Sequence, residues 1–109
     1  MSRKTTVDQR KLSEIIRRIV KVAAPEKIIL FGSAARGEVG PNSDVDLLVI
    51  KRGRCHRGRL TEKIYMNLFG VGQAVDVVVV TSADVKRYGG CFALVIYPAL
   101  REGKVVYAA

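Results

Sequence analysis

Residues 31–50 read FGSAARGEVGPNSDVDLLVI, and this stretch decides the fold because it joins a Gly-Ser turn to a strand that opens with two aspartates. The residues leading into it, Lys27–Phe31, form a short apolar run that predicts a strand buried on both faces. Ser33–Arg36 reads as one helical turn, and Gly37–Ser43 reads as a loop rich in turn residues. Asp44–Ile50 then predicts the second strand.

Asp44 and Asp46 are the first candidate site residues. Side chains alternate along a strand, so both carboxylates point to one side, with Cα atoms roughly 6.5 Å apart. Val45, Leu47 and Val49 then point to the other side, into the core. Two carboxylates this close repel each other unless a cation lies between them, and Mg²⁺ prefers such oxygen ligands. The same pattern also occurs where both carboxylates simply face water.

A third carboxylate, Asp76, lies inside a strongly β-branched segment, Ala74–Val80, that predicts a third strand. A carboxylate among so many valines is costly to bury without a partner. If this strand adjoins the one that carries Asp44 and Asp46, three carboxylates surround one site. The alternative is an edge strand on which Asp76 is exposed, and the neighbouring valines disfavour it.

The Gly32-Ser33 pair is a candidate phosphate site. Glycine lets a phosphate approach the backbone, and a hydroxyl and free N–H groups at the start of a helical turn can bind phosphate oxygens. Arg36 is placed to neutralise phosphate charge, and it is equally placed to pair with Glu38. A Gly-Ser pair by itself is weak evidence, because it is usually only a turn.

The rest of the chain predicts further helices and strands around this stretch. Apolar residues recur at helical spacing from Leu12 to Ala23, and Pro25 ends that helix. We expect its basic outer face to be solvated, with contact to RNA or a partner as the alternative. Lys51–Arg59 reads as a basic loop, either solvated or in contact with a nucleic acid or an acidic partner. Further predicted elements are a helix at Leu60–Phe69, a helix at Cys91–Glu102 and a strand at Lys104–Tyr107. This alternation predicts a small α/β or α+β domain with a mixed sheet flanked by helices.

Composition narrows the class of protein. The 109 residues fit one small domain, 1–109, and the formal net charge of +9 makes nucleic acid, nucleotide phosphates or an acidic protein plausible partners. Basic surfaces also occur merely for solubility. Cys55 and Cys91 are too few for a disulfide framework, so we expect free thiols in a reducing cytoplasm. No apolar run approaches the ~20 residues that span a bilayer, and we expect no membrane association.

Read from Gly32-Ser33 to Asp44-x-Asp46, the pattern G-S-x10-D-x-D resembles the signature of the polymerase β-like nucleotidyltransferase superfamily. GSAARGE followed by NSDVDLLV is similar to the minimal nucleotidyltransferase (MNT) domains of bacteria and archaea. Asp76 falls where that family has its third catalytic carboxylate. The closing REGKVVY resembles the usual end of such domains, so the resemblance covers nearly the whole chain.

The resemblance implies the polymerase β-like fold and a set of roles. Gly32 and Ser33 would bind the triphosphate of ATP or another NTP, with Arg36 beside it. Asp44, Asp46 and Asp76 would be the catalytic residues and would hold Mg²⁺.

MNT domains are often antitoxins encoded beside a HEPN-domain toxin, to which they transfer AMP at a tyrosine. Larger relatives carry an extra domain that grips the acceptor, and here we expect a partner protein to supply that part. Three alternatives stay open: an antitoxin that acts by contact alone, an enzyme that acts on RNA, and an enzyme that acts on a small molecule. Both a homo-oligomer and a hetero-oligomer are compatible with the sequence.

Overall fold

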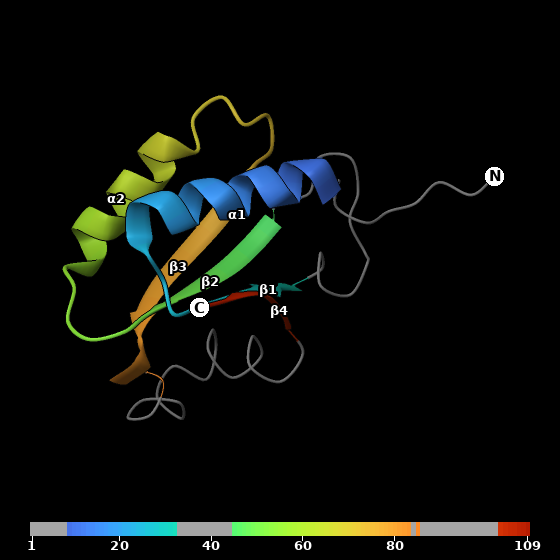
Figure 1. Cartoon of the computed structure of the whole chain (residues 1–109). Helices are drawn as coiled ribbons and strands as arrows, with labels where there is room; N and C mark the ends of the chain where they lie inside the picture. The colour runs from blue at the N-terminus through green and yellow to red at the C-terminus, as the bar shows by residue number, and fades with distance from the viewer. Residues whose placement is uncertain (1–8, 33–44, 84, 86–102) are drawn as a thin grey trace.

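The computed structural model describes residues 9–32, 45–83, 85 and 103–109 (Figure 1). The predicted helical turn at Ser33–Arg36, the loop at Gly37–Ser43 and the helix at Cys91–Glu102 lie outside these residues. The described elements are α1 (Gln9–Ala23), β1 (Lys27–Phe31), β2 (Val45–Lys51), α2 (Arg57–Asn67), β3 (Val75–Thr81) and β4 (Lys104–Ala108).

The described strands form one mixed sheet in the order β3-β2-β1-β4. β1 pairs with β2 and with β4 antiparallel, whereas β2 and β3 are parallel. A parallel pair needs a crossover connection, and α2 provides it. The prediction of an α+β domain with a mixed sheet flanked by helices is therefore confirmed.

Both faces of the sheet are buried along its central strands. One face packs against α1 and α2, which lie on the same side of the sheet (Figure 1). The other face carries a smaller buried cluster of Ile29, Leu48, Ile50 and Val80. Adjacent residues of β2, such as Leu47 and Leu48, are both fully buried because they point to opposite faces.

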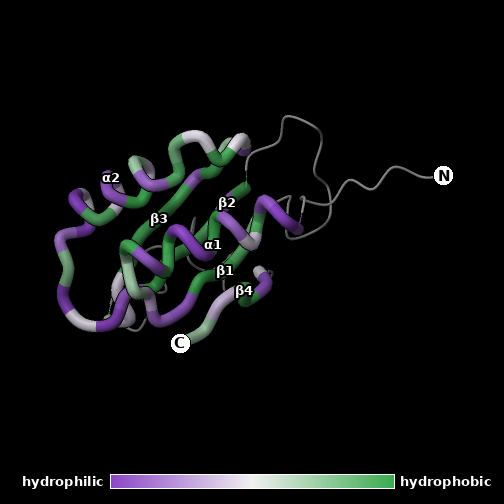
Figure 2. The backbone as a smooth tube through the Cα atoms, turned by 45° about the horizontal axis from the view of Figure 1, so that its top comes forward, coloured by the Kyte–Doolittle hydropathy of each residue, from purple (hydrophilic) through white to green (hydrophobic). Residues whose placement is uncertain are grey.

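α1 forms because its apolar residues repeat on one side, and Figure 2 shows hydrophobic and hydrophilic residues alternating along it. Leu12, Ile15, Ile19 and Ala23 are buried. The helix ends where Ala24 adopts a positive φ of 45° directly before Pro25, as the proline predicted. The part of the chain that the structure describes contains no helix long and apolar enough to cross a membrane.

The basic face of α1 is only partly solvated, which corrects the sequence-based expectation. Arg18 donates hydrogen bonds of 3.2 Å to the carbonyl oxygens of Asn67 and Phe69, at the C-terminal end of α2. Lys11 donates one of 3.0 Å to the carbonyl oxygen of Gly72. Cations are favourable at a helix C-terminus, where carbonyl groups lack partners within the helix. These side chains therefore join α1 to the end of α2 and to the loop that follows it.

α2 begins at Arg57, within the segment 51–59 that the sequence analysis treated as a loop, so that prediction was wrong over its last residues. The reason is an N-cap: the Nδ1 atom of His56 accepts a 3.1 Å hydrogen bond from the Arg59 backbone N–H. At the other end, α2 stops at Asn67, two residues before the predicted Phe69, and Gly70 and Gly72 in the turn that follows both have positive φ. Ile64 and Leu68 are buried on the inner side of α2 and of the turn that follows it.

Candidate active site

Asp46 and Asp76 lie side by side on the two parallel strands. Each is the second residue of its strand, and the two are register partners in the pairing of β2 with β3. Neighbouring strands lie about 4.8 Å apart, and register partners point to the same face of the sheet. The residues that follow them, Leu47 and Val77, belong to the core covered by the helices. Both carboxylates therefore point away from α1 and α2, on the other face.

Gly32 places the Gly-Ser turn against the same carboxylate. Phe31 is the register partner of Asp46 on β1, so Gly32 directly follows the row that contains both aspartates. Gly32 has a φ of +74°, and a Cβ built on it would overlap Oδ2 of Asp46 and lie 3.3 Å from its Cγ. Only glycine adopts this backbone conformation at low cost and also leaves space for the carboxylate.

The structure thus brings together three of the six predicted site residues: Gly32, Asp46 and Asp76. Ser33, Arg36 and Asp44 lie outside the described residues. Among the described side chains, no group of three histidine, cysteine, aspartate or glutamate residues is placed to hold a metal ion.

The position of Asp76 corrects one expectation. β3 is at the edge of the described sheet, and Asp76 is exposed, whereas the valines around it had favoured an interior strand. Those valines are explained differently: Val77 and Val79 pack against the helices, and Val80 packs on the opposite face. An edge position leaves Asp76 accessible to a large molecule and still in register with Asp46.

Tyr65 lies next to the candidate site and was not predicted from the sequence to do so. Its hydroxyl on α2 accepts a 2.8 Å hydrogen bond from the backbone N–H of Val77, the residue after Asp76. An edge strand has unpaired backbone groups on its outer side, and this bond satisfies one of them. No local pattern marks a tyrosine for such a role, because the contact exists only once α2 packs along β3.

The donor set suits a hard divalent cation. Two carboxylates at neighbouring register positions repel each other, and a cation that takes oxygen ligands removes that repulsion. The backbone of Gly32, which comes close to Asp46 without a side chain between them, leaves room for a phosphate next to the carboxylates. Asp46 and Asp76 are therefore the described residues best suited to hold such an ion.

Comparison with known proteins places the chain in a family. Residues 9–88, which include Gly32, Asp46 and Asp76, match the family described as "Nucleotidyltransferase domain". The chain belongs to this family. The prediction that the chain is a nucleotidyltransferase is confirmed by this family membership. Comparison with curated proteins gave no significant match.

Solved nucleotidyltransferase structures share the fold. A protein from Sulfolobus solfataricus assigned to the nucleotidyltransferases is 19% identical, with a TM-score of 0.63, over 91% of this chain and 78% of that chain. Spectinomycin adenyltransferase AAD(9) from Enterococcus faecialis, with ATP and spectinomycin, is 17% identical, with a TM-score of 0.59, over 91% of this chain and 54% of that one. A toxin-antitoxin structure with AMP-PNP is 21% identical, with a TM-score of 0.54, over 94% of this chain and 75% of that one.

Proposed function

We propose that this chain is a Mg²⁺-dependent nucleotidyltransferase that transfers AMP from ATP to a hydroxyl group, namely a tyrosine of a HEPN-family toxin for which it is the antitoxin. The observation that carries the proposal is the pair of in-register carboxylates, Asp46 and Asp76, with the backbone of Gly32 against the first. The family supports nucleotidyl transfer. The fold shared with a toxin-antitoxin structure that contains AMP-PNP supports the choice of nucleotide and of partner.

In this proposal the candidate site residues have separate roles. Gly32 and Ser33 bind the triphosphate, and Arg36 neutralises part of its charge. Asp44, Asp46 and Asp76 hold Mg²⁺, which when bound would neutralise phosphate charge and polarise the α-phosphate. A bound cation would also relieve the repulsion between the neighbouring carboxylates.

The transfer step follows from these positions. The acceptor oxygen forms a bond to the α-phosphorus, and the bond from that phosphorus to the oxygen bridging to the β-phosphate breaks. Pyrophosphate leaves with the electron pair. Asp76, exposed at the edge of the sheet, takes the proton of the attacking hydroxyl as a general base. A protein acceptor can reach this position because it lies at an edge strand.

In this proposal, residues 1–109 form a single domain that works in the cytoplasm, and the partner protein supplies the acceptor hydroxyl. The fold shared with spectinomycin adenyltransferase favours a second candidate, adenylyl transfer to a small molecule. The two candidates use the same carboxylates and differ only in the acceptor.

The test is transfer of label from ATP to a purified HEPN-family toxin. Label should pass to the toxin from α-labelled ATP with Mg²⁺, and it should not pass from γ-labelled ATP, which distinguishes nucleotidyl transfer from phosphorylation. Asp46→Asn and Asp76→Asn should each abolish the label. A toxin that stays unlabelled and is inhibited equally by wild type and Asp46→Asn would instead establish inhibition by contact. Label on RNA or on an aminocyclitol such as spectinomycin, with none on the toxin, would overturn the choice of acceptor.

A further inference from the structure

We propose that the outer face of α2 is the docking surface for the protein partner, and that the partner presents apolar side chains bordered by carboxylates. We call this surface the α2 face; it consists of Tyr65, Met66 and Phe69 with the charged residues Arg59, Glu62 and Lys63 beside them. This inference rests on the proposed function for the identity of the partner. It adds where on this chain the partner binds and which chemistry it presents.

The first observation is a concentration of exposed apolar side chains. Tyr65, Met66 and Phe69 are 41%, 75% and 88% exposed, and they account for three of the four large hydrophobic residues that are exposed in the described part of the chain. Phe69 lies four positions after Tyr65 and three after Met66, the spacings that bring side chains together on a helix and the turn that follows it. A clustered apolar surface of this kind is typical of a protein-binding site, whereas single exposed apolar residues are not.

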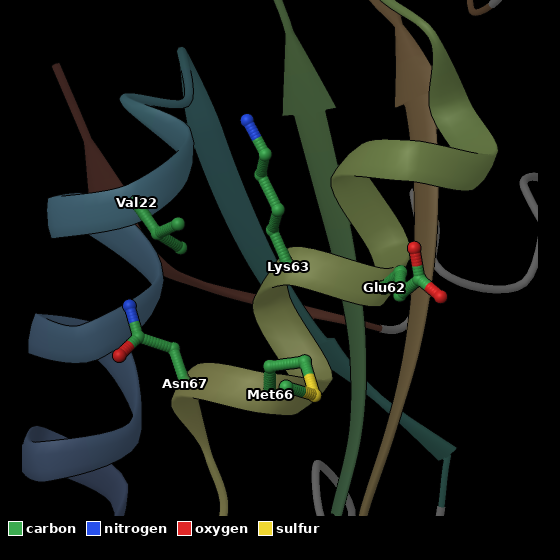
Figure 3. A pocket seen from close by; sticks show the side chains of 5 residues that line it. All are labelled: Val22, Glu62, Lys63, Met66 and Asn67. Carbon is green, nitrogen blue, oxygen red and sulfur yellow. The ribbon is translucent and has the colours of Figure 1, made fainter.

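The second observation is the shape of the surface. A hollow of about 580 Å³ is lined by Glu62, Tyr65, Met66 and Phe69. A second hollow of about 450 Å³ lies between α1 and α2 and is lined by Val22, Glu62, Lys63, Met66 and Asn67 (Figure 3). Met66 borders both, so partner side chains could enter on either side of it. Methionine is flexible and polarisable, which suits such a contact.

The third observation is the charge around the apolar residues. Arg59 and Lys63 line a third hollow of about 240 Å³ together with Lys51 and His56, and none of its described lining residues is acidic. Within the described residues, neither Arg59 nor Lys63 forms an ion pair. Arg59 and Lys63, the basic half of the α2 face, are therefore complementary to carboxylates on the molecule that binds there.

These observations together select one occupant. A second copy of this chain is disfavoured, because a two-fold contact would bring the basic halves of two chains with a net charge of +9 each against one another. A nucleic acid would suit the basic residues and could stack a base on Phe69, but it would leave Met66 without an apolar partner. A protein with apolar residues next to acidic ones satisfies both halves.

The position of the α2 face fits the proposed chemistry. α2 contacts β3, the edge strand on which Asp76 is exposed, and the aspartates point to the face of the sheet away from α2. A protein bound to α2 therefore lies beside the edge that carries Asp76 without covering the carboxylates. A segment of it could then reach the site around that edge.

The experiment measures the Kd of the purified HEPN-family toxin for this chain by calorimetry. Met66→Glu and Phe69→Glu should each weaken binding at least tenfold. Lys63→Glu should weaken it and reduce its salt dependence. The matched control is Val105→Glu, which adds the same charge at a 56% exposed position on β4 and should bind as wild type does. Thermal unfolding should be unchanged in all four variants, because the substituted side chains are exposed.

The outcomes separate this inference from the proposed function. If wild type binds the toxin and Met66→Glu and Phe69→Glu bind equally well, the α2 face is not the docking surface, and the proposed function stands. If wild type binds and the variants do not, but no label is transferred, the docking surface stands and the transfer is overturned. If wild type does not bind the toxin, both are overturned. A dimer of this chain that Met66→Glu dissociates, or binding of a single-stranded RNA that Met66→Glu weakens, would overturn the choice of a protein partner.

Discussion

Gly32 carries two constraints at once, and each can be measured separately. Its φ of +74° disfavours any side chain, and its backbone lies against the carboxylate of Asp46. Gly53 has a similar φ of +78°, but a Cβ there would meet nothing within 4 Å. The two glycines are therefore a natural pair for comparison, because only one of them contacts the candidate site.

We predict that Gly32→Ala and Gly53→Ala each lower the free energy of unfolding by about 1–2 kcal/mol, the cost of a left-handed conformation for a residue with a Cβ. Only Gly32→Ala should also abolish nucleotidyl transfer, because its methyl group displaces the Asp46 carboxylate. Urea unfolding and the labelling assay measure the two effects. Equal activity of the two variants would show that the close approach of Gly32 to Asp46 has no role in catalysis.

The carboxyl pKa of Glu14 is lowered by its neighbours on α1. Hydrogen bonds from Arg17 and Arg18 lower the pKa of Glu14 from 4.5 to about 2. The Arg18 Nε lies 2.7 Å from Glu14, and the same guanidinium binds the terminal carbonyls of α2. Because the pKa is lower in the folded state, the stabilisation is fully present above pH 4.5 and is lost as the pH falls toward 2.

We therefore predict that Glu14→Gln lowers the melting temperature by a constant amount above pH 4.5, and that the difference from wild type disappears near pH 2. Thermal unfolding followed by circular dichroism between pH 2 and 7 measures this. Glu62→Gln is the control, because Glu62 forms no ion pair within the described residues, and it should melt with wild type throughout. A Glu14→Gln difference that does not depend on pH would rule out an electrostatic cause.

At the scale of elements, α2 supports the edge strand β3 through the hydrogen bond that the Val77 N–H donates to the Tyr65 hydroxyl. We predict that Tyr65→Phe lowers the free energy of unfolding by about 0.5–1.5 kcal/mol, because the N–H of Val77 loses its acceptor while the ring stays. Hydrogen exchange at the Val77 amide should become faster. Tyr107→Phe is a matched control: Tyr107 packs against the core, and its hydroxyl makes no hydrogen bond within the described structure. Unchanged protection of Val77 would contradict the role of Tyr65.

The elements differ in how far the sequence could predict them, and the differences have physical causes. β1 has the predicted bounds, Lys27–Phe31, because KIILF is an apolar run between Pro25 and Gly32. α2 begins three residues before the predicted Leu60, since histidine is not a usual N-cap and Arg-Gly-Arg resembles a loop. Strands β2 and β3 are each displaced by one residue from their predicted ranges, which is within the usual uncertainty of strand ends.

The candidate site was predictable as a set of residues and only partly as an arrangement. The motif identified Gly32, Asp46 and Asp76 because their chemistry is local. Their exact register, and the edge position that leaves Asp76 exposed, depend on the order of strands in the sheet, and strand order depends on how all the elements pack. The hydrogen bonds from Arg18 and Lys11 to carbonyl oxygens at and after the end of α2 could not be predicted either, because donors and acceptors are far apart in the sequence.

At the scale of the whole molecule, the sheet has two buried faces, and β2 allows both to be tested from neighbouring positions. Leu47 lies in the cluster beneath α1 and α2, and Leu48 lies in the cluster on the opposite face. Both side chains are fully buried. A protein whose second sheet face were open to solvent would tolerate loss of one of these side chains and not the other.

We predict that Leu47→Ala and Leu48→Ala each lower the free energy of unfolding by about 2–5 kcal/mol, because each removes apolar contacts and leaves a cavity. Val105→Ala on β4, at a 56% exposed position, should change it by no more than about 0.5 kcal/mol. Urea unfolding with linear extrapolation measures all three. A cost for Leu48→Ala as small as that for Val105→Ala would mean that the face carrying Asp46 and Asp76 is not packed. The two carboxylates would then have no rigid support, and the geometry on which nucleotidyl transfer depends would be lost along with it.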